Sequence, residues 1–239
     1  MKALILNSGI GKRMGELTKK TNKCMAEIAP DTTIIDGQLK SLIKENLTDV
    51  VITTGPFADS LEKYVTEKYK EIHFEFRNNP VYDSTNYIYS IALAEDLLRD
   101  DIILMHGDLV FEQSVLHDII NSETSAMVVD ETLPLPEKDF KAVVENGKIT
   151  KVGIGFFDSA FAAQPLYKLK KDEWNVWLEN ILKFCEAGTR SCYAENAMNE
   201  ISDKIDIRPF NVNGRVCTEV DNLEDLAKVQ ALVKEKKMF

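Results

Sequence analysis

Two glycines and a group of cationic side chains follow the first apolar run of the chain, and together they have the chemistry of an anion-binding loop. Residues 3–6 are apolar and are followed by Asn7-Ser8-Gly9-Ile10-Gly11, with Lys12, Arg13, Lys19, Lys20 and Lys23 shortly after. Gly9 and Gly11 have no Cβ atoms, so consecutive backbone N–H groups can converge on an anion. The pattern predicts a buried strand that ends in a polyphosphate-binding loop.

Two familiar glycine motifs do not fit this loop. The P-loop requires Ser or Thr after Gly-Lys, whereas Arg13 follows Gly11-Lys12. The dinucleotide-binding fingerprint requires a third glycine at the position of Met14. A bare Gly-x-Gly also fits an ordinary tight turn with solvated lysines around it, so other residues of the chain must decide between a turn and a phosphate site.

Three carboxylates lie where short strands are predicted to end. Asp108 follows the continuously apolar run 102–105, which is typical of a strand buried on both faces. Glu219 and Asp221 alternate along 217–221, so both side chains point to one side of that segment. Asp108 and Asp221 offer oxygen ligands for Mg²⁺, with phosphate oxygens and water completing the shell. The alternatives are a turn residue for Asp108 and a helix N-cap for Asp221.

The composition indicates a globular protein with an acidic surface. Of 239 residues, 44% are hydrophobic, which is enough for a substantial core. Asp and Glu outnumber Lys and Arg by 39 to 29, and the formal net charge of −10 argues against binding to nucleic acid or anionic membranes. The four cysteines lack Cys-x-x-Cys spacing, which favours reduced thiols. No targeting segment, membrane span, repeat or linker is visible, so we expect one cytoplasmic domain over residues 1–239.

Helical and strand patterns alternate through residues 1–125. Apolar spacing predicts helices near 35–46, 57–65 and 87–98, and strands at 50–52, 72–76 and 101–105. Such an order predicts parallel strands whose carboxyl ends share one edge of the sheet, and both the glycine loop and Asp108 fall at that edge. This half of the chain is therefore expected to bind the nucleotide.

Residues 126–239 show shorter strands and are expected to form the acceptor-binding half. Strands are predicted at 126–129, 142–145, 148–152, 154–157 and 205–212, and helices at 174–185, 195–201 and 223–233. The whole pattern predicts an α/β fold. We expect a Rossmann-like three-layer sandwich in which helices flank a mostly parallel, mixed central sheet, with a small β/α region on the acceptor side.

In order and spacing of its motifs, the chain resembles the nucleoside triphosphate transferase superfamily. The size of the chain and the stretch 86–90 are most similar to the small bacterial cytidylyltransferases that make CDP-choline and CDP-aminoethylphosphonate. Two positions depart from the family pattern: Asn7-Ser8 replaces a pair of small apolar residues, and Asn22 replaces a proline. The resemblance is carried by the run 6–14, Leu17-Thr18, Lys23-Cys24-Met25, Asp108 and Glu219-x-Asp221.

The resemblance implies roles for individual residues at the nucleotide end. Arg13 would contact the β- and γ-phosphates, and Lys23 would reach the α-phosphate or the incoming phosphate. Asp108 and Asp221 would hold Mg²⁺. The remaining nucleotide-binding residues would be Asn7, Ser8, Gly9, Ile10, Gly11 and Lys12 around the triphosphate, and Ser84, Thr85 and Asn86 near the base and ribose, where these three also fit as caps of the helix that follows.

Acceptor-binding residues follow from the same resemblance. Phe157, Tyr193 and Glu195 fall where the choline-phosphate members place aromatic and acidic residues around a cationic head group, and Glu219 is assigned to the same group. Aromatic faces and a carboxylate both attract an ammonium. The implied substrates are CTP and a zwitterionic acceptor such as phosphocholine or 2-aminoethylphosphonate. Phe157 and Tyr193 fit equally as core residues.

The expected reaction is in-line attack of an acceptor oxygen on the α-phosphorus of CTP, with pyrophosphate leaving. It requires no catalytic histidine, so His106 is expected to pack or to support its neighbours. One alternative is a sugar 1-phosphate nucleotidyltransferase, although such enzymes are commonly longer in the acceptor half. A glycosyltransferase would need Asp-x-Asp, and His106-Gly107-Asp108 lacks the first aspartate. A non-catalytic nucleotide-binding module is the third alternative. The sequence does not predict the oligomeric state.

Overall fold

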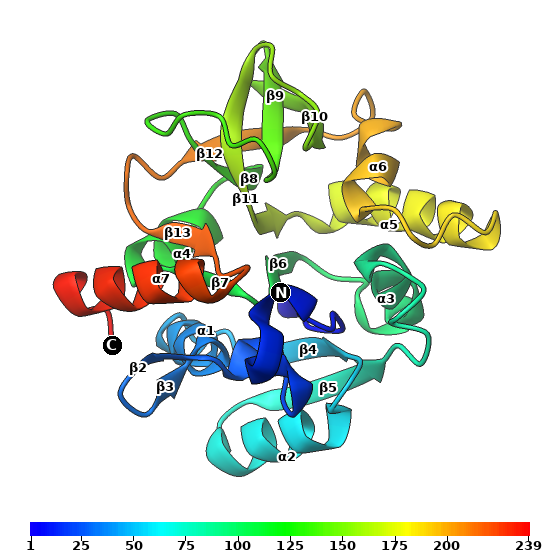
Figure 1. Cartoon of the computed structure of the whole chain (residues 1–239). Coiled ribbons are helices and arrows are strands. Elements are labelled where there is room, and N and C mark those ends of the chain that lie inside the picture. The colour runs from blue at the N-terminus through cyan, green and yellow to red at the C-terminus, as the bar shows by residue number, and fades with distance from the viewer.

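Four parallel strands form the part of the sheet that the first half of the chain contributes. A computed structural model describes all 239 residues and shows these strands in the order β5-β4-β1-β6 (Figure 1). Because β1 lies between two neighbours, the residues that follow it emerge at the middle of the sheet edge. The strands are β1 (Lys2–Leu6), β4 (Asp49–Thr54), β5 (His73–Asn78) and β6 (Ile102–His106).

The second half of the chain extends the same sheet with antiparallel pairs and one parallel pair, that of β12 with β8. The long strand β11 (Ala160–Leu169) pairs antiparallel with β6 and then with two further strands, so one mixed sheet of nine strands runs through both halves. The remaining members are β8 (Ser125–Asp130), β9 (Lys141–Glu145), β10 (Lys148–Gly153) and β12 (Ile207–Asn211). The predicted mixed central sheet is confirmed.

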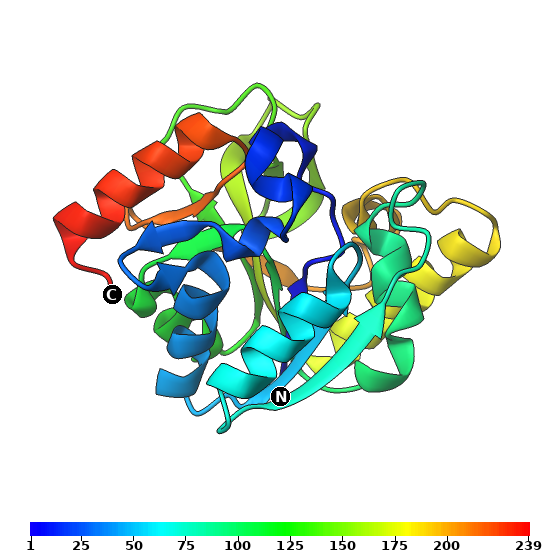
Figure 2. The ribbon, with the colours of Figure 1, turned by 60° about the horizontal axis from the view of Figure 1, so that its bottom comes forward.

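Helices cover both faces of the sheet and produce three layers (Figures 1 and 2). The alternation along β1 explains the layering, because Ala3 and Ile5 pack with one helical layer and Leu4 and Leu6 with the other. The first layer holds α1 (Ile34–Lys44), α2 (Ala58–Lys68) and α4 (Gln113–Ile120), and the second holds α3 (Tyr87–Leu93), α5 (Lys171–Glu186) and α6 (Ala194–Asn199).

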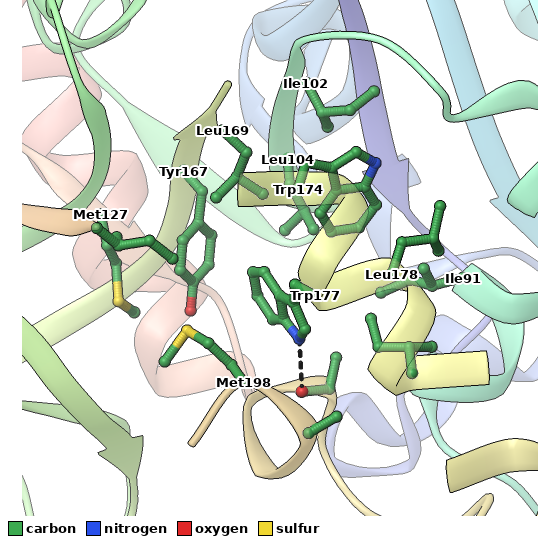
Figure 3. Packing of buried hydrophobic residues seen from close by; sticks show 14 of the residues in the cluster. Ile91, Ile102, Leu104, Met127, Tyr167, Leu169, Trp174, Trp177, Leu178 and Met198 are labelled. Carbon is green, nitrogen blue, oxygen red and sulfur yellow. Dashed lines mark hydrogen bonds between the residues drawn. The ribbon is translucent and has the colours of Figure 1, made fainter. Parts of the chain in front are cut away.

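The two tryptophans of α5 anchor the second layer. Both are fully buried, and the indole Nε1–H of Trp177 donates to the carbonyl of Ala194 at 2.9 Å (Figure 3). Trp174 donates in the same way to the carbonyl of Leu98 at 2.7 Å. Both tryptophans therefore belong to the core, and their polar atoms are satisfied as a buried indole requires.

Smaller elements complete the edge of the sheet above the glycine loop. Here α7 (Leu223–Lys236) packs over Met14, Ile28 and Val220. The smaller elements at this edge are the 3₁₀ helices Lys12–Lys19 and Lys23–Met25, the hairpin of β2 (Glu27–Ala29) and β3 (Thr32–Thr33), and the pair of β7 (Leu109–Phe111) and β13 (Cys217–Glu219). The distant segments 12–25 and 217–225 thereby lie side by side.

Two local expectations were wrong, and one central strand was not predicted. Residues 154–157 form turns instead of a strand, and the next strand is β11, which the sequence did not indicate. Its register shifts between Ala163 and Tyr167, around Pro165, and this bulge breaks the alternation that marks a strand. The predicted helix 87–98 is divided into α3 and the 3₁₀ turn Glu95–Leu97. None of the helices combines the length and apolar composition needed to cross a bilayer.

Candidate active site

The glycine loop leaves the end of β1 and turns back beside Lys23. Gly11 has a left-handed backbone with φ of 67°, and its carbonyl accepts the hydroxyl of Thr18 at 2.9 Å. A Cβ atom at Gly11 would lie 3.1 Å from Thr18 Cγ2 and 3.2 Å from Lys23 Cβ. Glycine is required there for both backbone conformation and space, which allows the loop to pack closely on Lys23.

At the two positions that depart from the family pattern, Asn7-Ser8 and Asn22, the side chains bond to other residues of the protein. Asn7 Nδ2 donates to Cys24 Sγ at 2.8 Å, and the hydroxyls of Ser8 and Ser90 are hydrogen-bonded at 2.6 Å. Asn22 Nδ2 donates to the carbonyl of Pro56 at 2.8 Å. These polar side chains therefore fix the path of the loop by internal hydrogen bonds.

Lys23 joins two strand-end carboxylates that are far apart in the sequence. Its Nζ donates to Asp108 Oδ2 at 2.5 Å and to Asp221 Oδ1 at 2.9 Å. Arg13 Nη2 donates to the same oxygen of Asp221 at 2.8 Å. The N-cap of α7 is Asn222, whose side chain accepts the next helical N–H groups, so Asp221 is left to face the cations.

The ionisation states of this cluster follow from its mutual contacts. Burial disfavours the charge on Lys23, but Asp108 and Asp221 outweigh it and raise the pKa of the ammonium. Burial likewise opposes ionisation of Asp108, yet Lys23 and His106 hold the pKa of that carboxyl below its usual value. Asp108 Oδ1 is buried without a hydrogen-bond partner. The Asp108 carboxylate is thus ionised, and its Oδ1 atom is free to accept a ligand.

Glu219 lies beside this pair and is held by a histidine. His106 Nδ1 and Glu219 Oε1 are 3.0 Å apart, and donor atoms of His106, Asp108 and Glu219 all lie within 4.8 Å of one another. Burial, followed by repulsion from Asp108, raises the pKa of Glu219, and the bond from His106 opposes this shift. The cluster offers the donor atoms of a divalent metal site.

Gln38 on α1 fixes the turn that carries Asp108. Its buried Nε2 donates to the carbonyls of His106 and Leu109, both at 2.8 Å. The turn is also closely packed, because a Cβ at Gly107 would lie 2.5 Å from Asn7 Oδ1. A neighbouring helix and the glycine loop therefore hold the backbone of the turn from two sides.

One cavity of about 370 Å³ connects the glycine loop with these carboxylates. The wall includes the cations Lys12, Arg13 and Lys23 and the acids Asp108, Glu219 and Asp221. Most of the predicted site thus shares one space, which is large enough for small-molecule ligands. The other predicted residues in its wall are Asn7, Ser8, Gly9, Gly11, Thr85, Asn86 and Tyr193, whereas Ile10, Ser84, Phe157 and Glu195 are not in it.

The three polar residues before α3 have different roles. Asn86 is the N-cap, and its Oδ1 accepts the N–H of Tyr87 at 2.7 Å. The hydroxyls of Ser84 and Thr85 donate to the carbonyl of Val81. The capping interpretation holds for Asn86 but not for Ser84 and Thr85, whose hydroxyls bond within the turn before the helix. Contact of Thr85 and Asn86 with a nucleotide stays a prediction, which their place in the cavity wall allows.

Three aromatic rings of the cavity wall, those of Tyr87, Phe140 and Tyr193, lie close to one another and are called the aromatic wall below. The Tyr193 ring lies 5.0 Å from the ring of Phe140 and 5.9 Å from that of Tyr87, measured between centroids. Only Tyr193 was singled out from the sequence. Tyr87 follows the predicted polar run 84–86 directly, and this position beside the proposed nucleotide-binding segment is the signal in the sequence that points to it.

Phe157 and Glu195 occupy places other than the expected one. Glu195 is 1% exposed and accepts hydrogen bonds from the hydroxyls of Tyr87 and of Tyr167, the latter at 2.9 Å. Phe157 is 52% exposed, and its ring centroid lies 4.3 Å from the Nζ of Lys141. Neither side chain is in the cavity wall, because each has found a partner within the protein.

Comparison with known proteins adds a family and several relatives. A family model described as nucleotidyl transferase matches residues 2–133. The CTP:phosphoglutamine cytidylyltransferase of Campylobacter jejuni is 31% identical over 164 residues, which cover 65% of this chain and 63% of that protein. The choline-phosphate cytidylyltransferase of Streptococcus pneumoniae is 21% identical over 249 residues, covering 99% and 100%.

A solved structure shares the fold over nearly the whole length. The CTP:phosphocholine cytidylyltransferase from Streptococcus pneumoniae superposes with a TM-score of 0.77 at 19% sequence identity. The match covers 97% of this chain and 98% of the other. The Rossmann-like architecture expected from the sequence is therefore confirmed by an experimentally determined relative.

Proposed function

Since the chain belongs to the nucleotidyl transferase family, we propose that it is a cytoplasmic enzyme that transfers CMP from CTP to a small phosphate- or phosphonate-bearing acceptor and releases pyrophosphate. The relatives named above support CTP as the donor. The observation that carries the proposal is the meeting of the glycine loop, Lys23 and three strand-end carboxylates around one cavity.

The glycine loop would bind the triphosphate of CTP. Gly9 has open space around its Cβ position, so a phosphate can approach the backbone N–H groups closely. Lys12 and Arg13 line the cavity on the same side. The Arg13 side chain is 67% exposed, so it can move from Asp221 to the β- and γ-phosphates at little cost in packing.

The carboxylates fit a magnesium ion. Asp108 offers a buried oxygen with no hydrogen-bond partner, and Asp221 adds a second hard oxygen beside it. We assign these two as the ligands, while His106 would hold Glu219 at the edge of the site. When bound, Mg²⁺ would neutralise phosphate charge and orient the triphosphate.

In the proposed reaction an anionic oxygen of the acceptor forms a bond to the α-phosphorus of CTP. The bond from that phosphorus to the bridging oxygen breaks, and the electron pair leaves with pyrophosphate. No general base is needed because the attacking oxygen carries no proton. Lys23 stays cationic, since its neighbours raise its pKa, and it would bring the two anions together and stabilise developing charge.

The aromatic wall would bind the head group of the acceptor. The rings of Tyr87, Phe140 and Tyr193 suit an amino or quaternary ammonium group, which is attracted to aromatic faces. Glu219, in the same cavity, adds a negative charge. Glu195 would act indirectly, because it accepts a hydrogen bond from the hydroxyl of Tyr87 and fixes the orientation of that ring.

A panel assay of pyrophosphate release tests this proposal. ATP, CTP, GTP and UTP would each be combined with phosphocholine, 2-aminoethylphosphonate, phosphoglutamine and glucose 1-phosphate. We expect turnover with CTP and an amino-bearing acceptor, and turnover lower by about 100-fold or more in the Lys23→Ala variant as matched control. Preference for glucose 1-phosphate would refute the acceptor class, and binding of CTP without turnover on any acceptor would refute catalysis.

A further inference from the structure

Lys141, the first residue of β9, is a fully buried cation without a carboxylate partner. Its Nζ donates to the carbonyl of Pro136 at 2.5 Å and to that of Asp139 at 3.1 Å. The ring of Phe157 faces the same ammonium at 4.3 Å. Burying a charge without a directly bonded counter-ion is unfavourable: burial lowers the pKa of Lys141, and the nearby charge of Asp139 opposes this shift only in part. Because this burial is unfavourable, we expect the segment that Lys141 holds to serve binding.

The carbonyls that Lys141 contacts belong to a loop that has no other internal support. Across residues 133–139, the two bonds from Lys141 are the only hydrogen bonds that the structure contains. Immediately beyond, the carbonyl of Phe140 accepts the N–H of Ala163 at 3.0 Å. Lys138, Asp139 and Phe140 all line the cavity. Lys141 therefore determines where this part of the cavity wall lies.

We propose that Lys141 and Phe157 are positioning residues that hold the 136–140 loop, and with it Phe140 of the aromatic wall, against the cavity, an inference that rests on the proposed function for its acceptor. Phe157 covers the ammonium from solvent and supplies a cation–π contact to it. An exposed aromatic ring outside the cavity thus contributes to acceptor binding through the lysine and the loop.

Lys168 provides a matched control with the same chemistry in another place. It is also buried, and its Nζ also donates to two carbonyls, those of Ile120 at 2.8 Å and of Ser122. Burial lowers the pKa of Lys168 as it does for Lys141. The segment that Lys168 holds follows α4 and contributes no residue to the cavity.

The test compares Lys141→Met with Lys168→Met, because methionine keeps most of the apolar stem and removes the donor. We expect Lys141→Met to raise the acceptor KM about tenfold, the effect of losing about one charged hydrogen bond, with the CTP KM changed less than about twofold. Tryptic cleavage after Lys138, followed by mass spectrometry, should accelerate in this variant alone. Phe157→Leu should change both quantities in the same direction by a smaller factor.

Unchanged acceptor KM and cleavage rate in Lys141→Met would overturn the proposal, as would equal effects in Lys168→Met. The cleavage comparison needs no substrate, so it tests the loop even if the wild-type protein transfers no CMP. A wild-type protein without turnover would refute the proposed function alone, and a wild-type protein with turnover but unaltered Lys141→Met would refute the positioning role alone.

Discussion

Asp36, which is fully buried, and Asp108, which is partly buried, are two carboxylates each paired with a lysine, but they differ in how many of their oxygens are satisfied. Asp36 accepts from the backbone N–H and hydroxyl of Thr33, both at 2.9 Å, and from the hydroxyls of Tyr64 at 2.8 Å and Tyr69 at 2.6 Å. Lys68 Nζ lies 2.9 Å away. Both oxygens are used, and together they cap α1 and tie it to α2 and the residue that follows it.

Asp108 has one oxygen bound to Lys23 and the other unpartnered. An unsatisfied buried oxygen costs stability, which a bound ligand can offset. The comparison suggests how a buried acid is to be interpreted in this fold: a saturated carboxylate stabilises the protein, whereas one with a free oxygen serves binding. Four predictions test this distinction.

The largest effect is expected at the unsaturated carboxylate. Asp108→Asn and Asp221→Asn should each lower kcat about 1000-fold, because each removes a charge at the proposed metal and phosphate site. Turnover and Mn²⁺ binding would be measured in parallel. The double variant should be little worse than either single one, since ligands of one ion act together. Losses that multiply would indicate two independent sites.

Removal of the shared cation comes next. Lys23→Ala should reduce kcat by about 100-fold or more, because one preorganised charge at the developing charge is worth about 3 kcal/mol. Circular dichroism should show an unchanged fold. Lys68→Ala is the matched control on the saturated carboxylate and should leave kcat within about twofold. Near-wild-type turnover of Lys23→Ala would remove this lysine from the proposed mechanism.

Asp36→Asn should affect stability instead of turnover. Burial opposes its charge, but the donors around it, Thr33 foremost, lower the pKa of Asp36 to about 2. The depressed pKa corresponds to about 2 kcal/mol of stability at neutral pH. That contribution is complete above the unfolded pKa near 4 and is lost as pH falls toward 2. Urea unfolding should therefore show a wild-type advantage that shrinks over this interval, and an advantage independent of pH would contradict the assignment.

The smallest effect is expected at Glu195, which is saturated but touches a residue of the cavity wall. Glu195→Gln should raise the acceptor KM about fivefold, by analogy with losing one hydrogen bond to a charged group, and should leave the CTP KM nearly constant. Tyr87→Phe removes the other half of the same bond, so the double variant should resemble the single ones. Additive increases in KM would show that the two residues act separately.

The nucleotide end was predictable from the sequence because its signals are local. Gly9 and Gly11 follow an apolar strand, and Asp108 follows another, so parallel topology alone brings them to one edge. The pairing with Asp221 also follows, because a strand leads into the last helix at that position. Nothing in these inferences required knowledge of which side chains contact one another.

The acceptor end was less predictable because its contacts are long-range. The spacing of residues along the sequence does not show whether the ring of Phe157 faces a ligand or the ammonium of Lys141, since either contact satisfies an aromatic face. The same holds for Glu195, which two tyrosines distant in sequence remove from the cavity. In β11, Pro165 and neighbouring alanines hide a central strand from any periodicity test.

Helix α1 joins the two carboxylates through residues only two positions apart. Asp36 secures the helix, and Gln38 grips the carbonyls on either side of Asp108. A substitution of Asp36 that shifts the helix would therefore also displace Gln38, because both residues lie on one rigid helical turn. Under random mutagenesis with selection for activity, we expect this helix to tolerate as few replacements as the glycine loop itself, although no residue of α1 reaches the cavity. Selection for activity is therefore expected to restrict substitutions in the residues that surround the site as well as in the site residues themselves.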